Sequence, residues 1–238
     1  FLFAVARVLV LTAVICAAAG AWMTVMPGHP RPSSARPPSP ALINSLKDHV
    51  GAISGERNAL AHGAALDRTA AYIESQLTRM GYAVQSQWFE VDGIRVRNLA
   101  VVIPGSAKGP VVVVGAHYDT ARFTPGADDN ASGVAALIEI ARAAKSTQPA
   151  PAELHLVFFT NEEPPWFRTQ SMGSYRYAEA LASANASVKA MLSLEMLGYY
   201  CDTPGCQKYP GPLSIAFPDR GEFIAFVGNL SSRSLVRE

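Results

Sequence analysis

Four short segments of the sequence carry residue types that can bind a metal ion or move a proton. In the first, HYDT (117–120), His117 and Asp119 lie two residues apart. In an extended chain this spacing directs both side chains to the same side, and a carboxylate placed there can orient a metal-binding imidazole or raise its basicity. A histidine and an aspartate at a strand end can also be purely structural. This segment therefore permits a metal site without requiring one.

The second segment, PGADDNASG (125–133), holds two adjacent carboxylates, Asp128 and Asp129, in a loop bounded by glycines. Aspartate, asparagine and serine cap the beginnings of helices, and capping would explain one or two of these residues. It does not explain why two like charges are held in one short turn. A divalent cation would remove their repulsion, and one carboxylate can bridge two such ions.

The remaining two segments are FFTNEEPP (158–165) and LSLEM (192–196). Glu162 and Glu163 are adjacent, so their side chains should diverge. One of them could then bind metal while the other acts as a general base, which is the division of roles that metal-assisted hydrolysis needs. Glu195 interrupts a run of apolar residues, where a charge is rarely left unpaired. It either pairs with a cation of the protein or binds a metal ion.

The elements that position these segments can be read from hydrophobic periodicity and turn residues. The sequence predicts helices over 42–53, 67–80, 131–145 and 171–183, and strands over 82–91, 94–103, 111–117, 153–160 and 188–196. Strands that alternate with helices indicate an α/β fold, here a three-layer sandwich with a mixed, mostly parallel central sheet. Ligands of such sheets bind at the carboxyl ends of the strands, which is where the four segments fall.

Taken in order along the chain, HYDT, GADDNASG, NEE and LSLEM resemble the metal-binding motifs of the dizinc aminopeptidases of peptidase family M28. The resemblance extends over roughly residues 41–217 and implies the zinc-exopeptidase fold. It also implies a metallopeptidase that uses two zinc ions in the complete protein and hydrolyses N-terminal residues of peptides. Glutamate carboxypeptidases, glutaminyl cyclases and the transferrin-receptor ectodomain are relatives of this family.

Transferred residue by residue, the resemblance implies that His117 binds one zinc ion, that Asp129 bridges both ions and that Glu163 binds the second. Glu195 stands where the family more often has an aspartate as a ligand of the first zinc ion, so the chain departs from the family pattern there.

The resemblance assigns different roles to the neighbouring polar residues. Glu162 would be the general base, which takes a proton from the attacking water and passes it to the leaving amine. Asp119 would orient His117 as part of the catalytic site. Asp128 and Asn130 would shape their loop without binding metal.

One part of the family pattern is missing. In the family, a histidine further along the chain than Glu195 completes the second zinc site, and this sequence has no histidine after His155. His29, His49 and His62 precede the metal motifs, and His155 lies within a predicted strand, where we expect it to be packed or exposed. We therefore expect the domain to be truncated at its C-terminus, and this chain by itself to be inactive or weakly active and to bind the second zinc ion weakly.

The N-terminal segment, residues 1–26, differs in character from the rest. Residues 8–26 carry no charge, which is about the length of a helix that crosses the roughly 30 Å hydrocarbon core of a membrane. Arg7 precedes this run, which favours an N-terminus in the cytoplasm. A signal peptide cleaved near residues 17–21 is the alternative. In either case the following domain is exported, as a membrane-anchored or a secreted protein.

The rest of the chain is predicted to contain a linker and one domain. Residues 27–40 are rich in proline and should form an extended spacer. Residues 41–238 then form the peptidase domain, incomplete at its C-terminus.

Composition and cysteine usage limit the possible partners and the compartment. The chain has 20 Lys and Arg against 19 Asp and Glu, and 49% of its residues are hydrophobic, so it is neither disordered nor typical of a nucleic-acid-binding protein. Cys201 and Cys206 flank a Pro-Gly turn. In an exported protein they favour a local disulfide over free thiols, since two cysteines alone do not make a zinc site.

Other functions remain compatible with the motifs. A glutaminyl-cyclase-like acyltransferase with a single zinc ion would retain His117, Asp129 and Glu163 equally well. A non-catalytic, receptor-like domain of the same fold is a further alternative, although such a domain has usually lost ligands. Trp166 and Phe167, in the segment after the two glutamates, could line a substrate pocket or pack on the domain.

Overall fold

The computed structural model describes residues 2–23, 37–106, 109–147, 150–209, 211, 214 and 217–237. The chain divides into two compact units. The larger is Pro37–Tyr199, and the smaller comprises Phe1–Arg36 together with Tyr200–Glu238. All four segments with candidate metal ligands belong to the larger unit.

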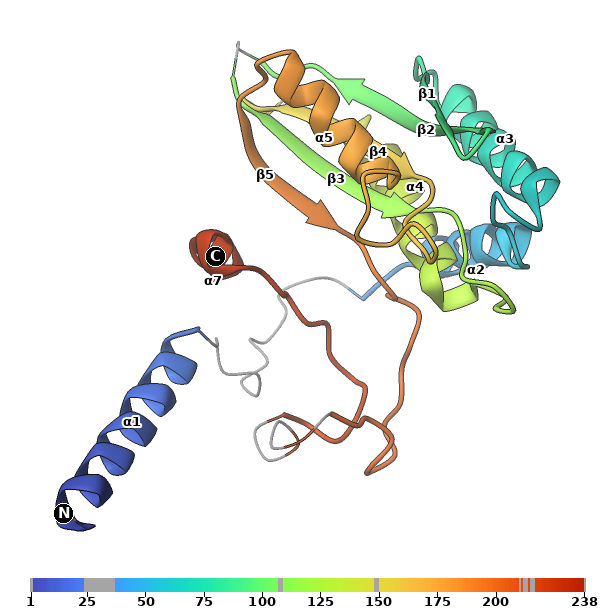
Figure 1. Cartoon of the computed structure of the whole chain (residues 1–238). Coiled ribbons are helices and arrows are strands. Elements are labelled where there is room, and N and C mark those ends of the chain that lie inside the picture. Colours follow the sequence, from blue (N-terminus) through green and yellow to red (C-terminus); the bar gives the residue numbers. More distant parts are fainter. Residues whose placement is uncertain are drawn as a thin grey trace. The chain divides into compact units, whose positions relative to one another are not determined.

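The larger unit is built around a mixed sheet. In the described residues its five strands follow the order β1-β2-β4-β3-β5 (Figure 1). They are β1 (Gln85–Val91), β2 (Ile94–Ile103), β3 (Val111–His117), β4 (Glu153–Phe159) and β5 (Val188–Ser193). β2 runs antiparallel to β1 and β4, whereas β3 runs parallel to β4 and β5. The predicted mixed α/β sheet is confirmed, and the carboxyl ends of β3, β4 and β5 lie at one edge.

The strand boundaries follow local sequence signals. β1 and β2 form the predicted hairpin, in which Val91 pairs with Ile94 across a two-residue turn. Asp92 and Gly93 both have positive φ angles in this turn, 52° and 76°, as the tight turns that match strand twist require. β3 is the continuous apolar run of the sequence, and it has a neighbouring strand on each side.

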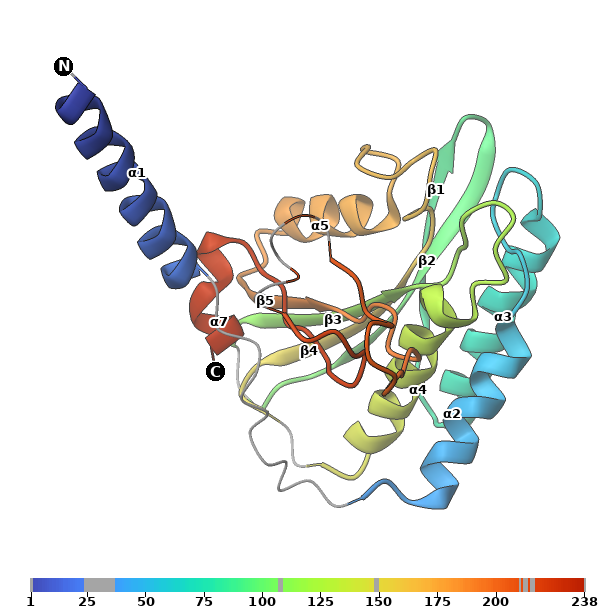
Figure 2. The ribbon, with the colours of Figure 1, turned by 90° about the horizontal axis from the view of Figure 1, so that it is seen from below.

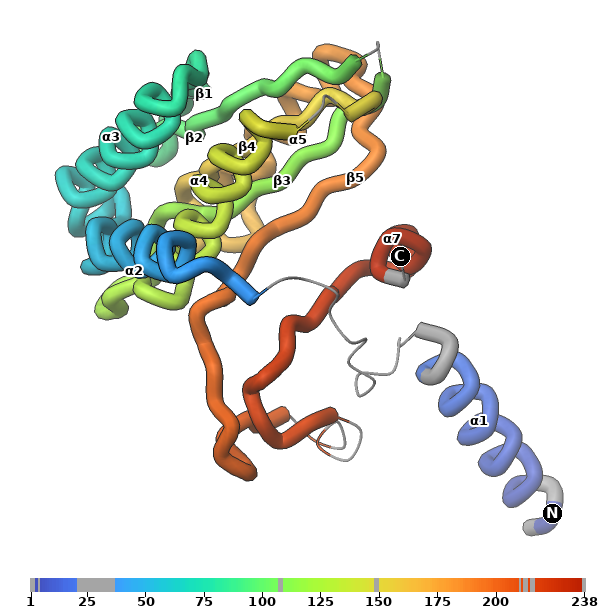
Figure 3. Tube along the Cα trace, turned by 180° about the vertical axis from the view of Figure 1, so that it is seen from behind, coloured from blue at the N-terminus to red at the C-terminus, as the bar shows by residue number. Residues whose placement is uncertain are grey.

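Helices cover both faces of the sheet and complete three layers (Figures 2 and 3). One face carries α2 (Pro40–Ile53), α3 (Gly63–Arg79) and α4 (Gly133–Ala144), and the other carries α5 (Gly173–Ser183). The larger core lies under the three helices and includes Ile73, Leu77, Leu99, Leu137 and Phe158. The smaller core lies under α5 and includes Val113, Val157, Phe159, Tyr177 and Leu181. Burial of these apolar side chains against both faces is the main force that holds the layers together.

One change in helix bounds affects the site. The sequence predicts a helix over 131–145, but α4 begins at Gly133 and follows the irregular turn η1 (Ala127–Ser132). Within η1, Asp129 and Asn130 have non-helical backbone angles. This turn carries the two adjacent aspartates, so their orientation is set by a loop and not by a helical surface.

The smaller unit contains α1 (Leu2–Met23), η2 (Leu230–Ser232) and α7 (Arg233–Arg237). Cys201 and Cys206 are joined by the predicted disulfide, with their Cα atoms 6.5 Å apart. Next to it, Cys201 forms a single antiparallel bridge with Gly221.

The predicted membrane-crossing segment is not supported. In the described parts of the chain, no helix is long and apolar enough to span a membrane. α1 contains Arg7 near its beginning, and residues 24–26 of the predicted segment lie outside the described residues, as does most of the predicted linker, 27–36.

A buried histidine joins the three helices of the larger core. His49 on α2 lies with its Nδ1 2.7 Å from the Tyr72 hydroxyl of α3 and its Nε2 3.2 Å from Glu139 Oε1 of α4. Burial lowers the pKa of His49 below its usual 6.5, although the hydrogen bond and charge of Glu139 act in the opposite direction. The folded chain therefore takes up a proton at this position less readily than the unfolded chain.

This difference predicts a loss of stability in acid. Because the unfolded chain binds the His49 proton at a higher pH, protonation favours unfolding as the pH falls below about 6.5. Because other groups titrate in the same range, the test compares two proteins: between about pH 7.5 and about pH 5.5 we expect the free energy of unfolding, measured by urea denaturation, to shift in favour of His49→Gln relative to the parent. His62, whose side chain is 47% exposed, provides the control His62→Gln, which should keep the pH dependence of the parent. An equal slope in His49→Gln and the parent would contradict this explanation.

Candidate metal centre

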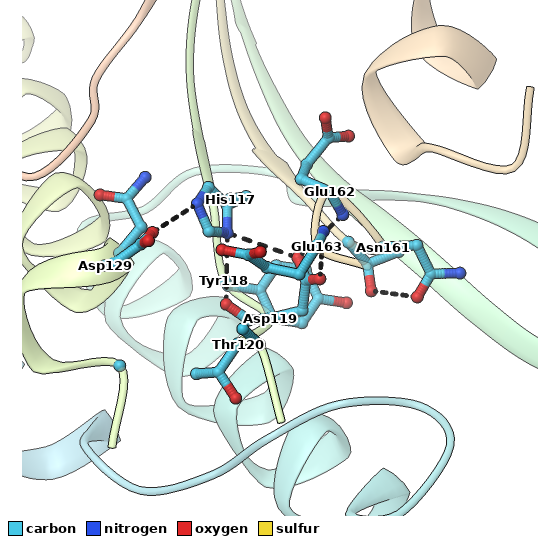
Figure 4. Close-up of polar contacts among 12 residues, drawn as sticks. His117, Tyr118, Asp119, Thr120, Asp129, Asn161, Glu162 and Glu163 are labelled. Atoms are coloured by element: carbon cyan, nitrogen blue, oxygen red, sulfur yellow. Dashed lines mark hydrogen bonds and ion pairs between the residues drawn. The ribbon is translucent and has the colours of Figure 1, made fainter. Parts of the chain in front are cut away.

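His117 is the last residue of β3 and is buried, with 6% of its surface exposed. Its Nε2 lies 3.0 Å from Asp129 Oδ1 and 3.3 Å from Glu195 Oε2. On the other side of the ring, Nδ1 lies 3.2 Å from the backbone oxygen of Asp119 and 3.5 Å from its Oδ1 (Figure 4). Asp119 can thus hold the proton of Nδ1, which leaves the Nε2 lone pair free for a metal ion.

Asp119 also connects the ends of two strands. Its side chain is almost completely buried, and its two carboxylate oxygens accept hydrogen bonds from the backbone N–H groups of Glu162, at 3.2 Å, and Glu163, at 3.1 Å. Backbone donors of this kind stabilise an ionised carboxylate in a buried position. The residue that holds His117 therefore also fixes the segment that carries both glutamates.

The two adjacent aspartates of η1 point to different partners. Asp129 approaches His117, whereas Asp128 Oδ1 accepts a hydrogen bond of 2.8 Å from the backbone N–H of Gly198. Ser132 strengthens this second connection, because its hydroxyl donates to the Asp128 backbone oxygen and accepts from the backbone N–H of Leu197. The turn therefore holds the segment that follows β5.

Asn130 also connects η1 to the segment that follows β5, and it does so from inside the protein. Its side chain is completely buried, and its Nδ2 donates to the Leu194 backbone oxygen, at 2.8 Å, and to Glu195 Oε2, at 2.9 Å. Its Oδ1 accepts from the backbone N–H groups of Gly133, at 3.1 Å, and Met196, at 3.3 Å. Both donors and both lone pairs of the amide are used, so Asn130 fixes the chain on both sides of Glu195.

The sequence predicts Glu195 within a strand, but the structure places it after the strand has ended. β5 ends at Ser193, and Glu195 follows it with 47% of its side chain exposed. Its second oxygen, Oε1, accepts a hydrogen bond of 2.6 Å from Ser193. Glu195 therefore reaches His117 from the segment that follows β5.

The three side chains bring their ligand atoms together. One atom each from His117, Asp129 and Glu195 lies within 4.8 Å of the other two. An imidazole nitrogen with two carboxylate oxygens is a donor set that zinc accepts. The chemistry of these side chains therefore fits a zinc ion.

The electrostatics of the cluster fit a cation as well. Burial disfavours the charged form of His117, but hydrogen bonds to Asp119, Asp129 and Glu195 outweigh it and raise the pKa of His117 to about 12. The same interaction with His117 lowers the pKa of Asp129, against the effect of burial. The carboxylates thus hold a proton on the ring, and a metal ion would compete for that position.

The adjacent glutamates diverge as the sequence predicted (Figure 4). Glu162 points toward the beginning of α5, where its carboxylate accepts hydrogen bonds from the backbone N–H of Ser174, at 2.6 Å, and from the Ser174 hydroxyl, at 2.8 Å. Glu163 points toward Asp129, and burial together with the charge of Asp129 raises the pKa of Glu163. The two carboxylates therefore face different surroundings.

A cavity of about 560 Å³ opens beside the cluster. Its polar lining includes His117, Glu162, Ser174 and Glu195, and the rest of the lining is mostly apolar, with Val113, Phe159, Leu181, Val188 and Met191 among its residues. The apolar residues come from β3, β4, β5 and α5, whereas Glu162 and Glu195 come from the segments that follow β4 and β5. The cluster and Glu162 thus share one opening.

Trp166 and Phe167, which could line a substrate pocket or pack on the domain, are not among the described residues that line this cavity. Trp166 is buried in the larger core, and its Nε1 donates to Asp92 Oδ2. Phe167 is 53% exposed and does not line the cavity. His155, which we expected to be packed or exposed, is buried on β4 between Tyr177 and Glu153.

Some residues around the centre were not singled out from the sequence. Ser174, which holds Glu162, follows the predicted beginning of a helix, and a glycine-serine pair at that position was the available signal. Arg57 gave no signal, because it is a lone arginine in a loop between two helices.

Comparisons with known proteins identify the family. The model of peptidase family M28 matches residues 98–216, which is half of the chain and includes all six predicted site residues. The chain is 44% identical over 182 residues to the uncharacterized protein YfbL of Escherichia coli, a match that covers 73% of this chain and 55% of that protein. It is 35% identical over 97 residues to the aminopeptidase YwaD of Bacillus subtilis, covering 40% of this chain and 20% of that protein.

The fold is shared with solved structures. The glutaminyl cyclase of an Acidobacteriales bacterium superposes with a TM-score of 0.58 at 22% identity, covering 76% of this chain and 68% of that chain. At this identity the likeness concerns the fold.

The chain belongs to peptidase family M28, and so to a family of zinc-dependent metallopeptidases. It spans about half the length of YfbL.

The hydrogen bonds of Asn130 lead to a stability prediction. Asn130→Ala would leave the backbone groups of Leu194 and Met196 without partners, so we expect the free energy of unfolding to fall by about 2–3 kcal/mol. Asn44, which is exposed on α2, provides the control Asn44→Ala, which should change it by less than about 0.5 kcal/mol. Urea denaturation followed by circular dichroism would measure both. Equal stabilities of the two variants would show that the Asn130 connection does not hold the segment.

Proposed function

We propose that this protein is a zinc exopeptidase, and specifically an aminopeptidase that hydrolyses N-terminal residues of peptides. The observation that carries the proposal is the clustering of three ligand atoms from His117, Asp129 and Glu195 beside Glu162, with two of these ligands lining the same cavity as Glu162. Metal ligands and a separate carboxylate at one opening are what metal-assisted hydrolysis requires.

His117, Asp129 and Glu195 would hold the first zinc ion. Glu163, which lies against Asp129, would contribute to a second, with Asp129 shared between the two. When bound, zinc would supply Lewis acidity, which polarises the scissile carbonyl and makes a water molecule more acidic.

Glu162 would act as the general base. Burial raises the pKa of Glu162 to about 7, although the two hydrogen bonds from Ser174 act in the opposite direction. A carboxylate that titrates near the working pH can accept a proton from water and return it to the leaving amine. Ser174 would hold this carboxylate at the cavity wall, and Asp119 would fix the backbone that carries it.

The charge of the site favours an aminopeptidase over a carboxypeptidase. The described residues that line the cavity include no lysine or arginine that could bind the α-carboxylate of a substrate. Glu195 lines the cavity, Asp129 belongs to the same cluster, and the carboxylate of Glu163 lies against Asp129. Bound zinc ions would offset these carboxylates, so the preference rests on the described lining, which offers no basic side chain for a terminal carboxylate.

A glutaminyl-cyclase-like acyltransferase is the second candidate, because a glutaminyl cyclase shares the fold over most of this chain. The two functions differ in metal content and in substrate. Two zinc ions per chain and hydrolysis of aminoacyl anilides would support the aminopeptidase. One zinc ion and cyclisation of N-terminal glutamine would support the cyclase.

We propose that the domain works outside the cytoplasm. The disulfide between Cys201 and Cys206 supports this, because disulfides persist in oxidising compartments.

Removing the carboxylate of Glu162 tests the assignment of the base. In the zinc-loaded full-length protein we expect Glu162→Ala to lower kcat for peptide hydrolysis by about 10²–10⁴-fold, with its zinc content unchanged. Glu179 on α5, with a side chain 55% exposed, provides the control Glu179→Gln, which should keep both. If Glu162→Ala loses zinc and activity together, Glu162 is a ligand and the roles of the two glutamates must be exchanged.

A further inference from the structure

Arg57 is a buried charged residue outside the proposed ligand set. It lies in the segment between α2 and α3, and only 1% of its surface is exposed. An unpaired charge in such a position is costly, so its partners show what it does.

The Arg57 guanidinium group binds the chain at two places between β3 and Asp129, one just after His117 and one just before η1. Its Nε donates to the backbone oxygen of Tyr118, at 2.7 Å, and its Nη2 to that of Gly126, at 2.9 Å. Its Nη1 donates to the backbone oxygens of Gly55, at 3.0 Å, and Pro125, at 3.3 Å. One side chain thus joins the strand end beside His117 to the beginning of the turn that carries Asp129.

The backbone of Arg57 adds to this connection. Its N–H donates to Thr120 Oγ1, at 3.0 Å, and its oxygen accepts from the Thr120 N–H, at 2.9 Å. The segment after His117 is therefore fixed to Arg57 by both the backbone and the side chain.

The charge of Arg57 also acts on the acidic residues. Burial lowers the pKa of Arg57 to about 10, while the nearby charges of Asp119 and Asp129 act in the opposite direction. The guanidinium group stays charged at neutral pH. Its charge opposes the repulsion between these carboxylates.

Gly126 shows how closely the turn fits on Arg57. A Cβ atom at Gly126 would lie 2.8 Å from Arg57 Nη1 and 2.2 Å from Thr120 Cγ2, and Gly126 has a φ of +56°. Only glycine combines this backbone conformation with such a close approach.

We propose that Arg57 is a positioning residue of the metal centre, which sets the place of Asp129 relative to His117 by binding the turn to the end of β3. This inference rests on the proposed function, because it assumes that Asp129 and His117 bind zinc. Lysine could not replace Arg57, since a single ammonium group cannot span carbonyl groups that a planar fork reaches together.

The test measures zinc affinity as well as stability. Arg57→Lys and Arg57→Met in the full-length protein would be compared with the parent by isothermal titration with zinc, after circular dichroism has shown that each is folded. We expect the dissociation constant of zinc to rise about 10–100-fold, as for other groups that orient metal ligands. The control is Arg97→Met, which removes a largely buried arginine on β2 paired with Glu74. It should lower stability and leave zinc affinity unchanged.

A second variant covers the case in which the Arg57 variants do not fold. Gly126→Ala keeps the buried charge but pushes the turn away from Arg57, and its zinc affinity should fall in the same way. Unchanged zinc affinity in folded Arg57→Lys or in Gly126→Ala would overturn the proposal and leave Arg57 a structural residue. If the parent itself binds no zinc, the metal centre proposed above is wrong, and the role of Arg57 falls with it.

Discussion

The structure of the larger unit must hold several carboxylates close together at one edge of its sheet, in spite of their mutual repulsion. Five carboxylates act on the single imidazole of His117, namely those of Asp119, Asp129, Glu162, Glu163 and Glu195. Two like charges 4 Å apart repel by about 4 kcal/mol near a protein surface, so each carboxylate needs a compensating partner. Backbone N–H groups, two serines, an asparagine and a buried arginine provide such partners. A bound cation would complete the same compensation.

The parallel part of the sheet makes this concentration possible. β3, β4 and β5 run in the same direction, so the residues that follow them meet at one edge although they are far apart in the sequence. β3 lies between the other two, so the residues that follow β4 and β5 can both reach the surroundings of His117 at its end. The antiparallel hairpin β1–β2 extends the core on the far side and supplies no ligand.

The fold is compatible with more than one reaction, as the likeness to a glutaminyl cyclase shows. What separates the reactions is the site. Glu162 is held by Ser174 at a cavity wall, while Glu163 faces Asp129, so two chemically identical residues differ through their surroundings alone. Such a difference is how one pair of carboxylates can supply both a ligand and a base.

The sequence by itself determined the features that depend on short-range geometry. Because successive side chains of an extended chain point to opposite sides, His117 and Asp119 lie on one side and the two adjacent glutamates diverge. The continuous apolar run of β3 predicts a strand that is covered on both faces. Tertiary structure decided the rest. Glu195 reaches His117 from beyond the end of β5, Asn130 binds a segment 64 residues further along the chain, and Arg57 binds carbonyl groups 61 and 69 residues away. Such contacts leave no periodic trace in the sequence, because packing of the layers brings their partners together only when the chain is folded.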